Sequence, residues 1–232
     1  QCYSKIFELN KNISKNDLID LIESLNEDKK FHGILLQLPL PKHLNEKEIL
    51  EKIKPSKDVD GFHPENQGYL VQGNPRFIPC TPLGCLKILK YYSIEISGKH
   101  VVIIGRSNIV GKPIASLLSQ NLEYGNATVT LCHTKTKDLS YFTTKADIII
   151  VAVGVPNLIT RQMIKEGVNI VDVGINRIED FSKEKGYKVV GDVDFDDVLG
   201  KASAITPVPG GVGVMTVTML LNNTIQAAIN SI

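Results

Sequence analysis

The sequence has few cysteines and little net charge, and so lacks the features that mark disulfide-rich, zinc-binding and nucleic-acid-binding proteins. Its 232 residues include only four cysteines, and these form neither a C-x-x-C pair nor a group with histidine at zinc-ligand spacing: Cys2, Cys80, Cys85 and Cys132. Such scattered cysteines fit reduced thiols in a cytosol-like compartment, and we expect no metal site. The net charge is only +1, so no overall basic field indicates a nucleic-acid partner.

The sequence also lacks an uninterrupted apolar run of membrane-spanning length. The longest runs, such as residues 148–153, fall far short of the roughly 20 residues that a span needs. The first residues show neither a signal-peptide pattern nor an initiator methionine. We therefore expect no membrane partner and a cytoplasmic location, with an organelle as the open alternative. The hydrophobic content of 43% is ample for the packed core of one or two domains.

The clearest positive signal is the stretch KHVVIIGRSNIVGKPIASLL at residues 99–118. Its apolar run at 101–104 is rich in β-branched residues and predicts a buried strand, which Gly105 ends. Gly111 and Pro113 then open an amphipathic run that predicts a helix. Strand, glycine turn and helix are typical of a nucleotide site, because glycine lets the backbone approach a pyrophosphate and the helix start offers free N–H groups. The spacing is not G-x-G-x-x-G, and an ordinary turn of an α/β protein is the alternative.

The end of the next predicted strand favours NADP over NAD. In NAD-binding folds an acidic residue about 20 positions beyond the glycine loop binds the ribose hydroxyls. Here residues 132–136 read CHTKT, without an acid, and Arg106 lies in the glycine loop itself. Cationic and hydroxyl donors without a carboxylate suit a 2′-phosphate. The alternative, a solvated loop, explains the lysine but not the missing acid.

The second half of the chain predicts an α/β fold. Val/Ile-rich runs at 127–132, 147–153 and 169–173 predict strands that alternate with helical segments, which indicates a doubly wound parallel sheet. Three glycines follow strands, where a dinucleotide would lie against the backbone: Gly154, Gly174 and Gly191. A proline- and glycine-rich loop at 206–213 offers a backbone shelf to a flat ligand, and an apolar helix is predicted at 215–229.

The first half predicts helices at 13–25, with Ser14 as N-cap, and at about 45–53, with a buried strand at 31–38 between them. Gln37 interrupts that strand near its C-terminal end. There it either bonds loop backbone or faces a ligand, since ligands of open α/β sheets gather at the carboxyl ends of strands. Thr81 and Pro82 predict the start of a further helix that reaches residue 91.

The polar loop at residues 57–64 contains two aspartates, Asp58 and Asp60. They are a possible metal pair, but the other ligands of a calcium loop are absent. We expect instead that one aspartate caps the turn and the other faces a ligand. His63 is expected to be a structural residue of the loop.

Six stretches of the sequence resemble, in the same order, the bifunctional methylenetetrahydrofolate dehydrogenase/cyclohydrolase family. They are HGILLQLPLP at 32–41, KDVDGF at 57–62, PCTP at 79–82, GRSNIVGKP at 105–113, DVGIN at 172–176 and TPVPGGVG at 206–213. The resemblance runs from about residue 5 to the C-terminus. It implies NADP-dependent oxidation of methylenetetrahydrofolate to the methenyl form and hydrolysis of that product to formyltetrahydrofolate, as part of one-carbon metabolism.

The resemblance also implies a domain organisation and an assembly. A folate domain at residues 1–80, completed by the C-terminal helix at 215–232, would pack against a Rossmann-like NADP-binding domain at 81–214. Tetrahydrofolate derivatives would be the substrates, and homodimers are usual in the family.

The resemblance assigns roles to residues. Gln37 falls on the active-site glutamine, which positions and tunes a catalytic lysine, and Asp60 falls on the aspartate that hydrogen-bonds the pterin. Cofactor contacts fall on Gly105, Arg106, Ser107, Thr134 and Ile175. Further substrate contacts fall on Leu36, Leu38, Pro209, Gly210, Gly211, Val212, Gly213, Val214, Met215, Thr216 and Val217. Two positions depart from the family: Val214 stands where proline is common, and Thr134 stands where serine is common.

The first fifty or so residues of the family, with a tyrosine and a lysine one helical turn apart, have no counterpart in this sequence. No lysine before Gln37 stands four residues after a tyrosine on a helical pattern, and the run from Tyr3 to Phe7 predicts a strand. We therefore expect a fragment without the catalytic lysine and with at most residual activity. Two alternatives stay open: a non-catalytic homologue that binds NADP or folate, and another two-domain NADP dehydrogenase, acting for example on shikimate-like acids. The Asp60 loop and the proline/glycine shelf argue against the second.

Overall fold

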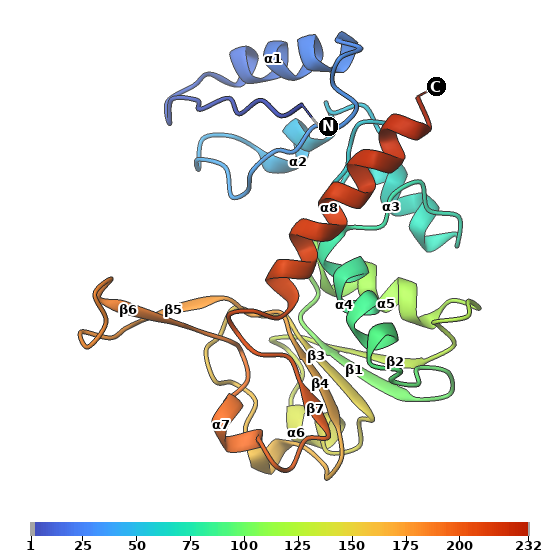
Figure 1. Ribbon diagram of the computed structural model, residues 1–232, viewed down its shortest axis with the longest axis vertical. Coiled ribbons are helices and arrows are strands. Elements are labelled where there is room, and N and C mark those ends of the chain that lie inside the picture. The colour runs from blue at the N-terminus through green and yellow to red at the C-terminus, as the bar shows by residue number, and fades with distance from the viewer. Residues whose placement is uncertain (1–2, 232) are drawn as a thin grey trace.

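The computed structural model describes residues 3–231, and its centre is a five-stranded sheet in the order β2-β1-β3-β4-β7 (Figure 1). Every neighbouring pair is parallel. The strands are β1 (His100–Ile104), β2 (Thr128–Cys132), β3 (Ile148–Val151), β4 (Asn169–Asp172) and β7 (Ala204–Ile205). The doubly wound α/β class and the strands expected from the apolar runs are thereby confirmed.

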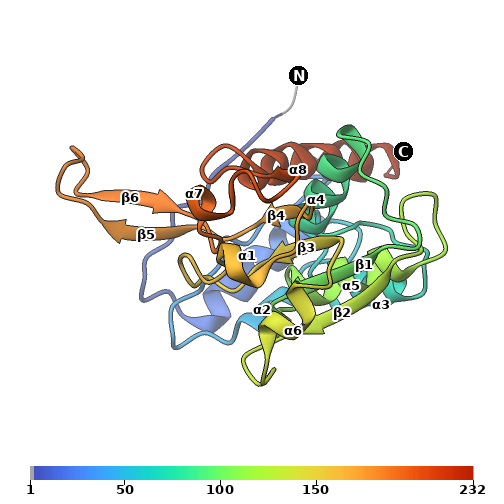
Figure 2. The same ribbon diagram turned by 90° about the horizontal axis from the view of Figure 1, so that it is seen from below.

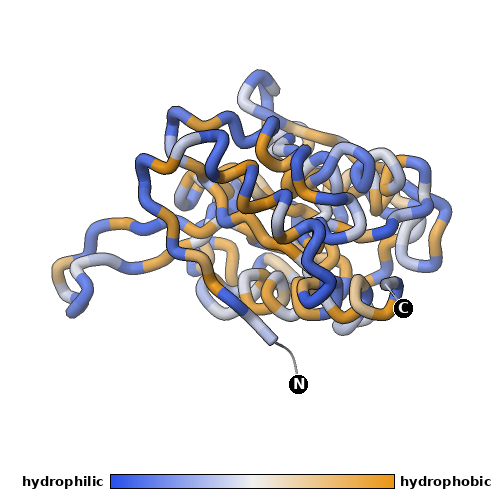
Figure 3. The backbone as a smooth tube through the Cα atoms, turned by 90° about the horizontal axis from the view of Figure 1, so that it is seen from above, coloured by the Kyte–Doolittle hydropathy of each residue, from blue (hydrophilic) through white to orange (hydrophobic). Residues whose placement is uncertain are grey.

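Helices cover both faces of the sheet because successive side chains of a strand point to opposite faces. Val101 and Ile103 of β1 pack with α4 (Cys80–Tyr91) and α5 (Gly111–Ser119). Val102 and Ile104 pack on the other side with α6 (Leu139–Thr143), η1 (Arg161–Met163) and α7 (Phe195–Val198). Figure 3 shows the hydrophobic segments gathered inside and the hydrophilic ones in the outer loops.

The N-terminal part has a core of its own. Helices α1 (Lys15–Glu27) and α2 (Glu46–Leu50) and the chain between them bury Leu18, Ile22, Ile34, Leu44, Ile49 and Ile53. The Ser14 hydroxyl caps α1, as predicted, by accepting the N–H of Asp17 at 3.1 Å. A helix that the sequence did not indicate, α3 (Pro64–Val71), follows. Its N-cap is His63, whose Nδ1 accepts the N–H of Glu65, so His63 has the structural role expected of it.

The long helix α8 (Val212–Ile229) connects the N-terminal part to the sheet (Figure 1). It lies directly on α4 because Gly84 has no side chain: a Cβ there would be 3.2 Å from the Cβ of Met215. By length and hydropathy alone, α8 is the one helix among residues 3–231 that could cross a membrane. The sequence contains no uninterrupted apolar run of this length here, because threonines and asparagines stand between the apolar residues of the helix. One of these, Asn223, is buried in the contact between α8 and the loops beside it.

Several predicted elements are wrong. Residues 31–38 form no strand, because within the described chain only Ile34 finds a partner, a single bridge to Asp58. Residues 3–7 form no strand either. Helix α4 has Pro79 as its N-cap rather than Thr81, and α8 begins at Val212 rather than at residue 215.

The antiparallel hairpin of β5 (Asn176–Glu179) and β6 (Tyr187–Val190) was also not predicted. It lies between β4 and α7 in the chain and projects away from the body of the molecule, as two views at right angles show (Figures 1 and 2).

Candidate active site

The predicted glycine loop leaves the end of β1 and turns directly into α5. Gly105 has a φ of 115°, and its N–H donates to the carbonyl of Cys132 at 3.0 Å. The Ser107 hydroxyl accepts the N–H of Val110 at 3.0 Å and so closes the turn. At Gly111 a Cβ would lie 1.9 Å from the carbonyl oxygen of Gly105. The first turn of α5 therefore approaches the strand end as only glycine permits, and its N–H groups suit a pyrophosphate.

The end of β2 lies beside this loop, because Ile104 of β1 is in register with Cys132 of β2. The turn after Cys132 is ordered by its own side chains: the N–H of His133 donates to Thr136 Oγ1 at 2.9 Å, and the N–H of Lys135 donates to His133 Nδ1 at 3.1 Å. Arg106 and Thr134 are both exposed and follow neighbouring strand ends. Residues 132–136 contain no carboxylate. A 2′-phosphate fits this combination of a guanidinium, hydroxyls and no acid.

The structure brings one predicted cofactor residue together with the predicted substrate loop. A small pocket of about 200 Å³ is lined by Ile175 and by the segment from Pro209 to Val214. Ile175 is 66% exposed, and its Cδ1 lies 3.8 Å from the point where a Cβ on Gly213 would be. A residue predicted to contact the cofactor and residues predicted to contact the substrate therefore line the same pocket, at the start of α8.

The remaining substrate residues on α8 divide between two faces of the helix. Met215 packs against Gly84, and the Thr216 hydroxyl lies 3.1 Å from the hydroxyl of Thr81 on α4. Val214 and Val217 are each 60% exposed. Val214 and Val217 are therefore the more exposed pair, whereas Met215 and Thr216 are half-buried against α4.

Asp58 and Asp60 have different environments although they stand two positions apart. Asp58 is buried and accepts hydrogen bonds from the N–H of Phe62 at 3.2 Å, the N–H of His63 at 2.8 Å and Asn66 Nδ2 at 2.8 Å. It is therefore the aspartate that caps the turn. Burial, and to a lesser degree the neighbouring Asp58 carboxylate, raise the pKa of Asp60 to about 6, although the Cys80 thiol acts in the opposite direction. A half-buried carboxylate of this kind is short of donors, which a ligand with N–H groups would supply.

Two residues that the sequence did not single out hold the Asp60 loop in place. Asn223 on α8 donates from Nδ2 to the carbonyls of Val59 at 2.9 Å and Ile78 at 3.0 Å. The Cys80 thiol also reaches the carbonyl of Val59, at 3.4 Å, and burial together with Asp60 raises the pKa of that thiol to about 12. A buried asparagine in an otherwise apolar helix is the signal that could have indicated this contact.

Gln37 lies in the extended segment that lacks strand partners. It is exposed, and its Nε2 donates to the carbonyl of the adjacent Leu38 at 3.0 Å, which is the loop-backbone contact expected as one alternative. Leu36 packs against the N-terminal core. Within residues 3–231 no hydrogen bond links Gln37 to Asp60, so the structure does not join the two predicted catalytic residues directly.

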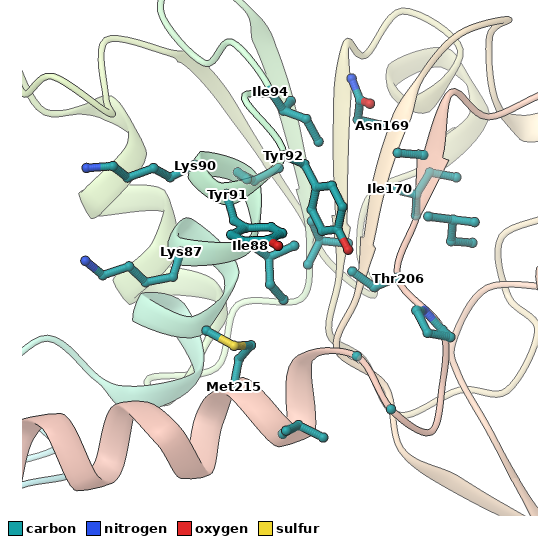
Figure 4. A pocket seen from close by; sticks show the side chains of 18 of the residues that line it. Lys87, Ile88, Lys90, Tyr91, Tyr92, Ile94, Asn169, Ile170, Thr206 and Met215 are labelled. Carbon is teal, nitrogen blue, oxygen red and sulfur yellow. The ribbon is translucent and has the colours of Figure 1, made fainter.

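A larger hollow, of about 930 Å³, lies elsewhere, between the end of α4, the β4–β7 edge of the sheet and the start of α8 (Figure 4). It shares Gly210, Gly211, Val214 and Met215 with the predicted substrate set. Its lining is mainly apolar, with Asn169 and Thr206 as polar exceptions, and contains no carboxylate; the two lysines beside it, Lys87 and Lys90, extend away from it in Figure 4. Because the N–H donors of a pterin are best matched by a carboxylate, we do not assign the substrate to this hollow.

The described residues contain no group of three or more histidines, cysteines, aspartates or glutamates arranged to hold a metal ion.

Comparison with known proteins identifies the family. Residues 79–232 match the family model described as "Tetrahydrofolate dehydrogenase/cyclohydrolase, NAD(P)-binding domain", and residues 1–60 match the catalytic-domain model of the same family. The chain is 54% identical over 226 residues to the bifunctional protein FolD of Prosthecochloris aestuarii, which covers 97% of this chain and 77% of that protein.

Solved structures agree with this match. The bifunctional FolD dehydrogenase/cyclohydrolase from Campylobacter jejuni has a TM-score of 0.89 and 57% identity, covering 97% of this chain and 76% of that one. The Trypanosoma brucei enzyme, solved in complex with NADP cofactor and an inhibitor, has a TM-score of 0.89 and 41% identity, covering 95% and 74%. The resemblance found in the sequence is confirmed: this chain belongs to the bifunctional methylenetetrahydrofolate dehydrogenase/cyclohydrolase family.

Proposed function

We propose that this protein oxidises methylenetetrahydrofolate to the methenyl form with NADP and hydrolyses that product to formyltetrahydrofolate. The observation that carries the proposal is the pocket where Ile175 meets the loop from Pro209 to Val214. Hydride transfer requires the donor carbon and the acceptor ring to lie side by side. This pocket adjoins the end of β4 on one side and α8 on the other, and α8 is hydrogen-bonded through Asn223 to the loop that holds Asp60.

The cofactor is NADP. Gly105 and Gly111 give the backbone approach that its pyrophosphate needs, and Arg106, Ser107 and Thr134 provide the guanidinium and hydroxyl donors for its 2′-phosphate side. Ile175, which follows β4, supplies an apolar contact to the cofactor on the other side of the glycine loop from Thr134. When bound, the cofactor accepts the hydride that the folate carbon releases.

Asp60 orients the substrate. An ionised carboxylate accepts two adjacent N–H donors of the pterin in a bidentate pair, which fixes the ring plane. Asp58 cannot take this role, because protein donors already occupy it. Leu36, Leu38 and the segment from Pro209 to Val217 complete the contacts to the flat ring and its tail.

Hydrolysis of the methenyl bridge needs a water to be activated and a proton to be moved, which is general acid–base work. In the proposal a lysine does this work and Gln37 positions it. The side-chain nitrogen of Gln37 donates to the Leu38 carbonyl. The side-chain oxygen of Gln37 is then the atom that can accept a hydrogen bond from an ammonium group. Lys57 is engaged elsewhere, since its Nζ donates to the carbonyls of Leu25 and Asp28 at 2.8 Å each.

The proposal is tested by following NADPH formation and methenyl hydrolysis spectroscopically with methylenetetrahydrofolate as substrate. We expect both reactions when the catalytic lysine is present and at most residual turnover without it, with NADP preferred to NAD. Binding of NADP and folate without any turnover, even with the lysine present, would indicate a non-catalytic homologue instead. Reduction of NADP by a shikimate-like acid but not by the folate would indicate a different dehydrogenase.

An Arg106→Ala variant is expected to bind NADP ten- to a hundredfold more weakly, because a charged phosphate contact contributes roughly 1.5–3 kcal/mol. Its affinity for NAD, which lacks the 2′-phosphate, should stay the same. The measurement is a calorimetric titration of each cofactor into the wild type and the variant. Lys87→Ala, which removes an exposed positive charge on α4, is the control and should change neither affinity. Equal affinity of the wild type for NADP and NAD would refute the assignment.

The proposal includes a homodimer in the cytoplasm. The apolar hollow beside α4, with Tyr91 80% exposed and Tyr92 67% exposed at its edge, is the kind of surface that subunit contacts cover.

A further inference from the structure

Two aspartates at the ends of β4 and β6 are buried: Asp172 is 3% exposed and Asp192 is fully buried. Within residues 3–231 neither forms an ion pair with a lysine, arginine or histidine. A buried carboxylate without a cation is costly unless hydrogen-bond donors surround it. Hydrogen-bond donors must therefore offset the cost of burying this aspartate pair, and the groups that supply them show what the pair holds in place.

Almost all of these donors are main-chain N–H groups of neighbouring loops. Asp192 accepts the N–H groups of Val153 at 2.7 Å and Gly154 at 3.0 Å, and the side-chain amide of Asn176 at 2.8 Å. Asp172 accepts the N–H groups of Gly174 at 2.9 Å, Asp192 at 3.0 Å and Val193 at 2.9 Å. The pair thus joins the loop after β3, the loop after β4 and the segment after β6.

Two glycines make room for these carboxylates. A Cβ on Gly174 would lie 2.2 Å from Asp192 Oδ1, and a Cβ on Gly191 would lie 1.8 Å from Asp172 Oδ2. The sequence had suggested that these glycines let a dinucleotide lie against the backbone. In the structure the side on which each Cβ would stand is taken by an aspartate carboxylate, so these positions require glycine for that reason as well.

The loops that the aspartate pair joins lie on one side of the expected cofactor site. In open α/β sheets a dinucleotide binds outside the carboxyl ends of the strands, at the point where the strand order reverses. Here that point lies between β1 and β3. The glycine loop and Thr134 follow β1 and β2, whereas Val153, Gly154 and Ile175 follow β3 and β4. The loops after β3 and β4, which contain Val153, Gly154 and Ile175, therefore lie on the side expected for the nicotinamide half of the dinucleotide.

We infer that Asp192 is a positioning residue for the nicotinamide half of the cofactor. It does not touch the cofactor. Its carboxylate fixes the Val153–Gly154 backbone and, through Asn176, the loop that presents Ile175. Asp172 holds Asp192 in turn by accepting its N–H. The inference rests on the proposed NADP site, and the experiment below separates the two.

An Asp192→Asn variant keeps the shape but replaces one accepting oxygen with an N–H₂ group that faces either the two main-chain N–H groups or the Asn176 amide. We expect NADP to bind at least tenfold more weakly. Adenosine 2′,5′-bisphosphate carries only the adenosine half and uses the loops after β1 and β2. Its affinity should stay within twofold of the wild type.

The control is Asp147→Asn, the same substitution at the opposite end of β3, where the carboxylate accepts the N–H of His100 at 2.8 Å. It should change neither affinity. An Asn176→Ala variant removes one donor to Asp192 and leaves the two main-chain donors, so it should weaken NADP binding less and still spare the bisphosphate. It serves as the second test if Asp192→Asn does not fold, which thermal unfolding of each variant will show.

The outcomes distinguish the possible errors. Equal loss of NADP and bisphosphate binding in a folded variant would mean that Asp192 supports the whole domain rather than one half of the site. Unchanged NADP affinity in Asp192→Asn would also overturn the inference. Failure of the wild type to bind either compound would refute the proposed cofactor site itself.

Discussion

A Gly111→Ala variant is expected to lose NADP affinity by roughly a hundredfold, or about 2.7 kcal/mol. The added Cβ would lie 1.9 Å from the carbonyl oxygen of Gly105, 2.6 Å from its carbonyl carbon and 2.9 Å from the Cα of Arg106. All three are backbone atoms, so the strain is relieved only if the loop and the start of α5 separate. That separation removes the N–H groups from the pyrophosphate and displaces Arg106. The affinity is measured by calorimetric titration at a temperature where the variant is folded.

Gly68→Ala is the matched control for this prediction. Gly68 lies in α3 with no atom within 4 Å of an added Cβ, and alanine is favoured over glycine in a helix by about 1 kcal/mol. This variant should keep its NADP affinity and unfold at a slightly higher temperature. A folded Gly111→Ala protein that binds NADP as tightly as the wild type would show that the start of α5 is not the pyrophosphate site.

The parts of this fold that were predictable are those in which local sequence and burial agree. The runs that became β1, β3 and β4 are short, β-branched and apolar because helices cover both faces of the sheet. Ser14 and Asp17 specify the start of α1 within one turn of chain, and the structure contains that cap. In each case a few neighbouring residues carry the whole signal.

The parts that were not predictable depend on partners distant in the sequence. Residues 31–38 have the composition of a buried strand, but strand formation needs neighbouring backbone, and only the bridge from Ile34 to Asp58 is available within residues 3–231. The projecting β5–β6 hairpin has charged residues along it and no buried face of its own, so its hydrophobic pattern is weak.

The site shows the same division. The glycine loop and the acid-free turn after β2 are local, and the sequence indicated both. Asp192, by contrast, bonds to residues 38 and 39 positions earlier in the chain, and Asn223 reaches back to Val59 across 164 positions. Such contacts become visible only when the topology places the loops together. The signal they leave in the sequence, a polar residue among buried neighbours, says that partners exist but not which ones.

Asp60 is the residue whose replacement should affect the substrate most. Its pKa of about 6 means that burial disfavours the charged form, and the protein itself supplies few donors to compensate. Pterin N–H groups bind the carboxylate and not the carboxylic acid. Tetrahydrofolate affinity should therefore be constant above pH 7 and fall by up to about tenfold per pH unit below 6.

Asp60→Asn places an N–H₂ donor against the pterin donors, so we expect folate affinity to fall by roughly a hundredfold while NADP affinity is unchanged. The pH dependence below 6 should disappear with the carboxylate. The titrations are done with tetrahydrofolate under anaerobic conditions between pH 5 and 8. Folate affinity equal to that of the wild type would refute the role of Asp60.

Stability separates this binding role from a structural one. Because the folded-state pKa of Asp60 is raised from 3.8 to about 6, its contribution to stability is fully present below about pH 4 and is lost as the pH rises through 6. At pH 7 the ionised side chain opposes folding, so Asp60→Asn should unfold at the same temperature as the wild type or higher. Asp58→Asn is the contrasting variant: it removes one of the two accepting oxygens, so that either the N–H of Phe62 or the donors of His63 and Asn66 lose their acceptor, which should cost about 1–3 kcal/mol. If Asp60→Asn were instead the less stable of the two, Asp60 would be a structural residue, and its effect on folate would be secondary.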